Sequence, residues 1–108
     1  MLSSLQEGIN WPTGPGGVQT NGYWGNGFWD NDMWSMLSVL PMWPNLAKTG
    51  INYRYERISQ AADYSRQHGS KGLFYPLQTA VTGQEIDLVP WTNILEKHTG
   101  ADIVNLLR

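Results

Sequence analysis

Apolar residues gather in three segments of the chain, and each segment predicts a helix. The first follows Asp30, where no Gly or Pro interrupts the apolar positions Met33, Trp34, Met36, Leu37, Val39 and Leu40. This density is typical of a helix that is buried on most of its surface. Pro41 and Pro44 are expected to end it.

The second predicted helix covers residues 44–67. Pro44 suits the first helical turn, and Gly69 after His68 suits the left-handed residue that stops a helix. Spacings of three and four predict one apolar face, made of Ala47, Ile51, Tyr55, Ile58 and Ala62, with Arg54 on another face. Gly50 costs about 1 kcal/mol relative to Ala inside a helix, so its presence indicates close packing.

A third helix is predicted at residues 99–107, where Thr99 and Asp102 resemble a capping box before an apolar run. Long Gly-rich and aromatic loops join the three helices, with a short extended piece at 72–75 and a turn at Thr82-Gly83. No alternating strand pattern of any length is present, so we predict an all-α fold. Helices that are apolar nearly all round need more neighbours than this chain supplies, which indicates part of a larger helical domain.

Composition removes several classes of function. The 108 residues contain no Cys and carry a net charge of -2, with Lys and Arg scattered singly. Thiolate metal sites and Cys nucleophiles are therefore excluded, and a nucleic-acid partner is not expected. No apolar run approaches the roughly 20 residues of a membrane span, so no membrane partner is expected either.

The densest candidate site is the stretch Gly22 to Asp32, which lies within the region that holds five of the six Trp residues. Its glycines deliver Trp29 and Asp30 to the start of the first helix. A Trp face can stack on the apolar face of a sugar ring, and a carboxylate can accept hydrogen bonds from two neighbouring hydroxyls. The alternative is structural, with Trp29 in the core and Asp30 as an N-cap.

The motif Gly-Tyr-Trp-Gly-Asn-Gly-Phe-Trp-Asp-Asn-Asp at 22–32 resembles a signature of glycoside hydrolase family 65 and its trehalase-like relatives. The resemblance extends over nearly the whole chain in the family's order. It includes Ser3-Ser4-Leu5, Gly14-Pro15-Gly16-Gly17-Val18, Pro44-Asn45-Leu46-Ala47, Tyr53-Arg54, Lys71-Gly72-Leu73-Phe74-Tyr75-Pro76, Thr82-Gly83-Gln84-Glu85 and Glu96 to Ile103. Three positions depart from the family: Asn26 stands where a His is usual, Leu77 where a Trp is usual, and Lys97 where the residue is often apolar.

The resemblance implies an (α/α)6 barrel, of which residues 1–108 would form an N-terminal part of the catalytic domain. The family cleaves α-glucosides with inversion, using water or phosphate, so the implied partners are a glucose-containing disaccharide and the rest of the barrel. Trp29 and Asp30 match residues that hold the glucosyl ring, and Asp30 is the candidate catalytic residue. The general-acid Glu is expected downstream of Arg108, and no cofactor is expected.

Three further residues are weaker candidates. Glu85 matches a loop Glu of the family and is expected to bind a sugar hydroxyl, or else to be an exposed turn residue. Asp32 is expected mainly to interact with the helix dipole, and His98 to make a structural hydrogen bond near the site. Because His98 has no second His at ligand spacing, no metal site is expected.

Three functions remain open from the sequence. The chain is part of an α-glucoside hydrolase, part of a disaccharide phosphorylase, or a truncated copy without catalytic activity. The Gly14-to-Gly17 loop and the Gly-Tyr-Trp-Gly motif favour the hydrolase branch, whereas Asn26 and Leu77 favour the third reading.

Overall fold

A computed structural model describes residues 5–14, 24–86, 98–106 and 108. Its elements, in order, are β1 (Gly27–Phe28), η2 (Asn31–Ser35), α1 (Met36–Val39), α2 (Pro44–Glu56), α3 (Ile58–Gln67), β2 (Gln78–Thr79) and α5 (His98–Leu106). The fold is mainly helical, as predicted, but it also contains a small sheet. The loop that carries Gly16 and Gly17, and the segment around Glu96, lie outside the described residues.

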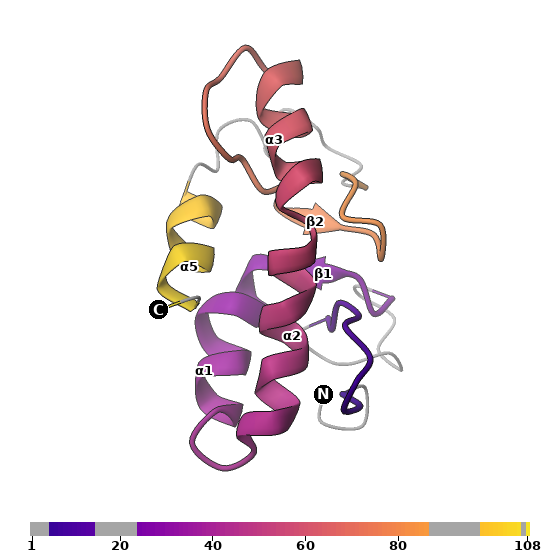
Figure 1. The fold of residues 1–108 in the computed structure, drawn as a ribbon, viewed down its shortest axis with the longest axis vertical. Helices are drawn as coiled ribbons and strands as arrows, with labels where there is room; N and C mark the ends of the chain where they lie inside the picture. Colours follow the sequence, from indigo (N-terminus) through magenta and orange to yellow (C-terminus); the bar gives the residue numbers. More distant parts are fainter. Residues whose placement is uncertain (1–4, 15–23, 87–97, 107) are drawn as a thin grey trace.

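Helices α1 and α2 lie side by side along the long axis of the molecule (Figure 1). A short connection joins α1 to α2, α3 continues above α2, and α5 lies beside η2 and α1. The main apolar cluster lies between these elements and consists of Leu5, Met36, Val39, Ala47 and Leu106. A second cluster, of Ala61, Tyr75 and Ile103, joins α3 to α5.

The first predicted helix has two parts with different geometry. Residues Asn31–Ser35 form a π-helical turn, in which the backbone N–H of Met36 donates to the carbonyl of Asn31, and α1 follows directly. Met36 and Val39 are buried, but Trp34 is 57% exposed and Leu37 and Leu40 are also exposed. The expectation of burial on most sides is therefore wrong for this chain, because α2 and α5 pack against this segment but leave Trp34, Leu37 and Leu40 uncovered.

The second predicted helix is broken at Arg57. The chain leaves helical geometry there, with φ -102° and ψ 15°, so α2 and α3 replace one helix over 44–67. The Nε of Arg57 donates to the carbonyl of Val81 at 3.0 Å. Its aliphatic stem packs against Gly83, where an added Cβ would lie 2.7 Å from Cδ of Arg57. Arg57, at the break, thus ties the helices to the loop that follows β2.

The start of α2 and the end of α3 are set by residues that favour those positions in a helix. Pro44 begins α2, as predicted. After α3, Gly69 has φ +66°, and the N–H groups of Gly69 and Ser70 donate to the carbonyls of Arg66 and Ser65. This is the Schellman arrangement that a left-handed Gly permits. The predicted stop at His68-Gly69 is therefore confirmed.

The buried face of α2 and α3 differs from the predicted one. Tyr55, placed on the apolar face, is exposed, whereas Arg54, placed on another face, is buried. The face that is buried contains Ala47, Gly50, Arg54, Ala61 and Ser65. The close packing indicated by Gly50 is confirmed, because a Cβ there would lie 2.6 Å from Sδ of Met36.

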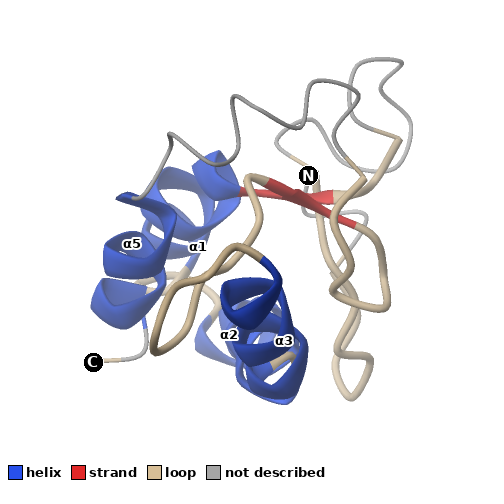
Figure 2. Cartoon of the chain, turned by 90° about the horizontal axis from the view of Figure 1, so that it is seen from above, coloured by secondary structure: helices blue, strands red, loops and turns tan. Residues whose placement is uncertain are grey.

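The small sheet crosses the helices near the top of α2, and Figure 2 shows it beside them. β1 pairs antiparallel with β2, with Gly27 opposite Thr79 and Phe28 opposite Gln78. A Cβ on Gly27 would lie 2.7 Å from Oγ1 of Thr79, so this close approach requires Gly. The segment predicted to be extended, 72–75, is not helical and forms no strand pair, and the paired residues come later. The turn at Thr82-Gly83 is confirmed by φ +83° at Gly83.

The C-terminal helix begins one residue before its predicted start. Thr99 lies inside α5, and its hydroxyl donates to the carbonyl of Tyr75 at 2.9 Å. Thr99 therefore ties α5 to the loop after α3, and the predicted capping box is wrong. Asp102 instead pairs with His98. Among the described helices, none is long and apolar enough to cross a membrane.

Candidate functional site

Trp29 and Asp30 have helical backbone geometry between β1 and the π-helical turn. Asp30 lies at the N-cap position of η2 with φ -55° and ψ -32°, and its side chain makes no capping hydrogen bond. A capping Asp has non-helical backbone angles and accepts a bond from the first turn. The expected alternative, Asp30 as a simple N-cap, is therefore wrong.

The carboxyl group of Asp30 is partly shielded from water. Burial raises its pKa above the ordinary value, and a hydrogen bond from the backbone N–H of the same residue partly offsets this effect. A carboxylate that is partly desolvated and is not used by its own helix suits the binding of a polar ligand.

Trp29 is half-buried and does not belong to either apolar cluster. Its indole contacts the ring of Trp34, with centroids 5.1 Å apart, and the imidazole of His98 at 4.8 Å. Neighbouring Phe28 is 6.3 Å away. Trp29 thus contacts two rings close to it in the sequence and one from α5, and it is not a core residue.

Asp32 has a different role from the expected one. It does lie in the first turn of η2, but its side chain is 1% exposed and forms a bidentate ion pair with Arg54, which is 2% exposed. The three nitrogen–oxygen distances are 2.5, 2.9 and 3.1 Å. The helix dipole is therefore a minor influence on Asp32, because the guanidinium contact is direct and buried.

The charges of this pair act on each other strongly. Burial raises the pKa of Asp32, Arg54 opposes that shift, and the nearby carboxylate of Asp102 adds to it. Burial alone would lower the pKa of Arg54, but the contact with Asp32 outweighs it and raises that pKa. Arg54 therefore stays protonated and holds η2 against α2.

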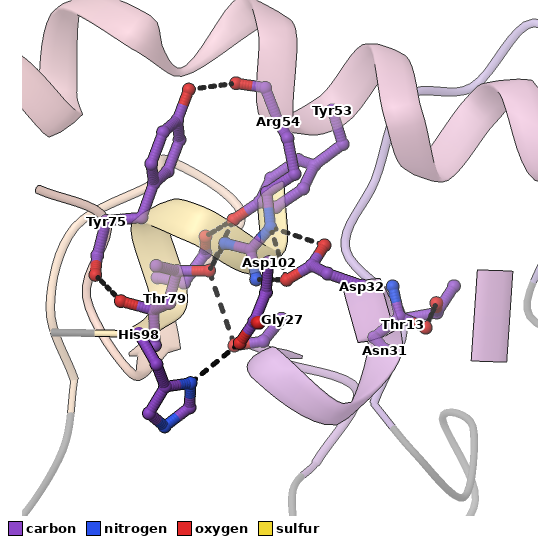
Figure 3. A network of polar contacts seen from close by, with 12 residues as sticks. Thr13, Gly27, Asn31, Asp32, Tyr53, Arg54, Tyr75, Thr79, His98 and Asp102 are labelled. Carbon is purple, nitrogen blue, oxygen red and sulfur yellow. Dashed lines mark hydrogen bonds and ion pairs between the residues drawn. The ribbon is translucent and has the colours of Figure 1, made fainter. Parts of the chain in front are cut away.

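The network around Arg54 reaches the small sheet (Figure 3). Nη1 of Arg54 donates to Oγ1 of Thr79 at 3.3 Å. The hydroxyl of Tyr53 lies 2.8 Å from the same oxygen and donates to the carbonyl of Ala80 at 2.6 Å. This network connects α2, η2 and β2, and it fixes both sides of the Trp29-Asp30 segment.

His98 lies at the start of α5, 41% exposed, with Nδ1 2.7 Å from Oδ2 of Asp102 (Figure 3). The expectation of a structural hydrogen bond is confirmed, and its partner is now defined. Asp102 is buried next to Asp32. The sequence analysis overlooked this pairing, although the separation of four residues is the spacing at which helical side chains meet.

Glu85 lies elsewhere. Its carboxylate accepts a hydrogen bond from the hydroxyl of Tyr64, and it lines a groove of about 470 Å³ along α3. The described residues of this groove include none of the rings around Trp29. They are Gln60, Asp63, Tyr64, Gln67, His68, Gly83, Gln84 and Glu85. The structure thus brings Trp29, Asp32 and His98 into one neighbourhood and gives Glu85 a separate one.

Arg54 is the other residue that the sequence analysis did not assign to the site. Its position three turns after Pro44, four residues after the closely packed Gly50, could have indicated burial. Trp34 and Trp43 are exposed, whereas Tyr53 is buried. No group of three or more metal-ligating side chains occurs within the part of the chain that the structure describes.

The chain is similar in sequence to known proteins. The chain is 38% identical over 85 residues to a kojibiose hydrolase from Mucilaginibacter mallensis, covering 79% of this chain and 13% of the hydrolase. It is 30% identical over 115 residues to a kojibiose phosphorylase from Caldanaerobacter subterraneus subsp. tengcongensis, covering 95% of this chain and 15% of the phosphorylase. A kojibiose phosphorylase from Halothermothrix orenii is 29% identical over 100 residues, covering 81% and 13%.

The chain therefore spans 13 to 15% of the length of these relatives. The match to a family is much more complete, since residues 3–104 match the glycosyl hydrolase family 65 central catalytic domain. The helical fold and the order of the motifs agree with this match. The chain belongs to glycosyl hydrolase family 65.

Proposed function

We propose that this chain forms part of the sugar-binding end of an (α/α)6 barrel that hydrolyses an α-glucosidic bond with inversion. The complete barrel, of which residues 1–108 form an N-terminal part, is called the parent enzyme below. Trp29 and Asp30 hold the glucosyl ring at the cleaved bond. The observation that carries the proposal is the Asp30 carboxylate, which is partly shielded and makes no capping bond.

The chemistry assigned to these two residues is binding that strengthens in the transition state. The indole of Trp29 stacks on the apolar face of the ring, and Asp30 accepts hydrogen bonds from two adjacent hydroxyls. As the ring flattens toward an oxocarbenium-like state, both contacts tighten, so they lower the barrier. The acid that protonates the leaving oxygen comes from the remainder of the parent enzyme.

The substrate we favour is an α-linked glucose disaccharide of the kojibiose type, because three relatives carry kojibiose in their names. Hydrolysis is favoured over phosphorolysis by the higher identity to the hydrolase, 38% against 30% and 29%. Phosphorolysis is the second candidate, because the match to one phosphorylase covers 95% of the chain. Incubation of the parent enzyme with kojibiose, with and without inorganic phosphate, separates the two. A hydrolase releases only glucose, whereas a phosphorylase needs phosphate and forms glucose 1-phosphate.

Variants of the parent enzyme test the assignment of Trp29 and Asp30. Trp29→Ala and Asp30→Asn should each lower kcat on kojibiose, and not only raise KM, because the contacts strengthen in the transition state. Melting temperatures should change little, since neither side chain is in the core. Val104→Ala, at an exposed position of α5, is the control and should match the wild type in both respects. A folded Asp30→Asn enzyme with full turnover would refute the sugar-binding assignment.

A further inference from the structure

We propose that His98, held by Asp102, is a positioning residue that fixes the plane of the Trp29 indole. The inference rests on the proposed function, because it concerns how Trp29 presents its face to a sugar. It assigns His98 no direct contact with the substrate. It explains why a residue 69 positions away in the chain is brought to the start of the first helix.

The contact between the two rings has a defined geometry. The imidazole of His98 meets the indole of Trp29 with an interplanar angle of 79° and a centroid separation of 4.8 Å. This is an edge-to-face arrangement, which is favourable between aromatic rings and depends on their orientation. Trp34 contacts the same indole at 5.1 Å with an angle of 59°. The indole is thus held by one ring from η2 and one from α5.

The His98 ring is itself fixed by its neighbour one helical turn away. Nδ1 lies 2.7 Å from Oδ2 of Asp102, and we assign the proton of this bond to Nδ1, since a carboxylate oxygen accepts hydrogen bonds. This bond fixes the orientation of the ring and the nitrogen that carries the proton. A ring held in this way sets the plane of Trp29 more firmly than a freely rotating ring would.

Charge explains why Asp102 bonds to His98. Asp102 is buried close to Asp32, and Asp32 already occupies both Nε and Nη2 of Arg54. Two buried carboxylates therefore lie close together, and Arg54 contacts one of them, Asp32. The N–H of His98 is the donor that the structure supplies to the second carboxylate. Asp102 in this way connects His98 to the buried ion pair of Asp32 and Arg54.

A double-mutant cycle in the parent enzyme tests the inference, with kcat/KM on kojibiose as the measured quantity. His98→Ala should lower kcat/KM about 10-fold, as expected when a binding side chain loses its preorganised geometry. If His98 acts through Trp29, the double variant Trp29→Ala/His98→Ala should be no worse than Trp29→Ala alone. Multiplied losses in the double variant would overturn the inference.

Two replacements separate positioning of Trp29 from a structural role. His98→Gln keeps a side-chain donor for Asp102 but has no ring, so it should lose as much kcat/KM as His98→Ala. His98→Phe keeps the ring edge and should recover part of the loss. Full recovery by Gln, or none by Phe, would contradict the inference. Val104→Ala, on the exposed face of the same helix, controls for general effects on α5.

The same cycle distinguishes failure of this inference from failure of the proposed function. If Trp29→Ala leaves kcat/KM unchanged, the assignment of Trp29 to the sugar site is wrong, and the role of His98 falls with it. If Trp29→Ala lowers kcat/KM but the His98 loss multiplies with it, the sugar site stands and only the positioning role is wrong.

Discussion

Arg54 shows what a single buried charge does at the scale of one residue. Its guanidinium is 2% exposed, yet it contacts Asp32 through two nitrogens and Thr79 through a third. The backbone carbonyl of the same residue accepts a hydrogen bond from the hydroxyl of Tyr75 at 3.1 Å. One residue therefore connects η2, β2 and the loop after α3.

Breaking the ion pair of Asp32 and Arg54 should destabilise the protein strongly. Asp32→Asn in the parent enzyme leaves the Arg54 guanidinium buried without a counter-charge, which costs about 3–5 kcal/mol of unfolding free energy. The matched control is Asp63→Asn, because Asp63 pairs with Arg66 on the surface, where such pairs contribute about 0–1 kcal/mol. Urea unfolding of the two variants makes the comparison. Equal unfolding midpoints would contradict the importance of the buried pair.

If Asp30 binds the sugar as proposed, its ionisation gives binding a pH dependence. Burial raises its pKa, and only the ionised carboxylate accepts two hydroxyl hydrogen bonds. Binding should therefore weaken as pH falls through this raised pKa, beginning at a higher pH than for an exposed Asp with a pKa of about 3.9. The inhibition constant of glucose against the parent enzyme, measured from pH 4 to 7, reports this weakening at low pH. If binding to Asp30→Asn weakens over the same pH range, another group causes the effect.

At the scale of elements, sequence reasoning succeeded where local chemistry decides. Pro44 begins α2, Gly69 stops α3 and Gly83 forms a turn, because each needs a backbone geometry that few other residues allow. It failed where a distant partner decides. Burial of Arg54 depends on Asp32, 22 residues away, and the break at Arg57 coincides with its bond to Val81, 24 residues away.

The candidate site divides in the same way. Trp29 and Asp30 are candidates that the motif alone suggests, because the Gly-rich stretch and the start of the helix are local features. The approach of His98 to Trp29 could not, since it depends on how α5 packs against η2. The separation of Glu85 was hidden for the same reason, because Tyr64 on α3 determines where its carboxylate lies.

Packing between helices predicts the effect of changing Gly50. Ala normally stabilises a helix interior by about 1 kcal/mol relative to Gly, but here its Cβ would lie 2.6 Å from Sδ of the fully buried Met36. We expect Gly50→Ala to destabilise the parent enzyme by about 1–3 kcal/mol, as overpacking does. Gly50→Ala should cost less stability when it is added to Met36→Ala than when it is added to the wild type, as measured by urea unfolding. Lys48→Ala, at an exposed position of α2, is the control, and equal stability of Gly50→Ala and Lys48→Ala would contradict close packing.

At the scale of the whole molecule, the exposed apolar side chains agree with the proposal that the chain is part of a larger barrel. Trp34, Leu37, Leu40, Met42 and Trp43 are all exposed and lie on or directly after the first helix. Apolar surfaces of this kind promote contact with other surfaces. In the proposed barrel, further helices would cover them.

The chain of 108 residues expressed alone should therefore associate and lack activity. Size-exclusion chromatography with light scattering should detect oligomers, and Leu37→Lys should reduce them by placing a charge on the exposed face. No glucose should be released from kojibiose, because inversion needs a second carboxyl group across the bond. A monomer that melts in one sharp reversible transition, or one that turns over kojibiose, would count against the fragment proposal.

The π-helical turn at Asn31–Ser35 allows the chain beside the site to change its length. It holds one residue more than α-helical hydrogen bonding would, since Met36 bonds back five positions to Asn31. This turn and an α-helical turn with one residue fewer both complete about one turn of the helix. Deleting one residue here would therefore restore α-helical spacing while Trp29, Asp30 and α1 kept nearly the directions that they have. Loss or gain of a single codon within this turn is thus a change that evolution can make without turning the candidate site residues away.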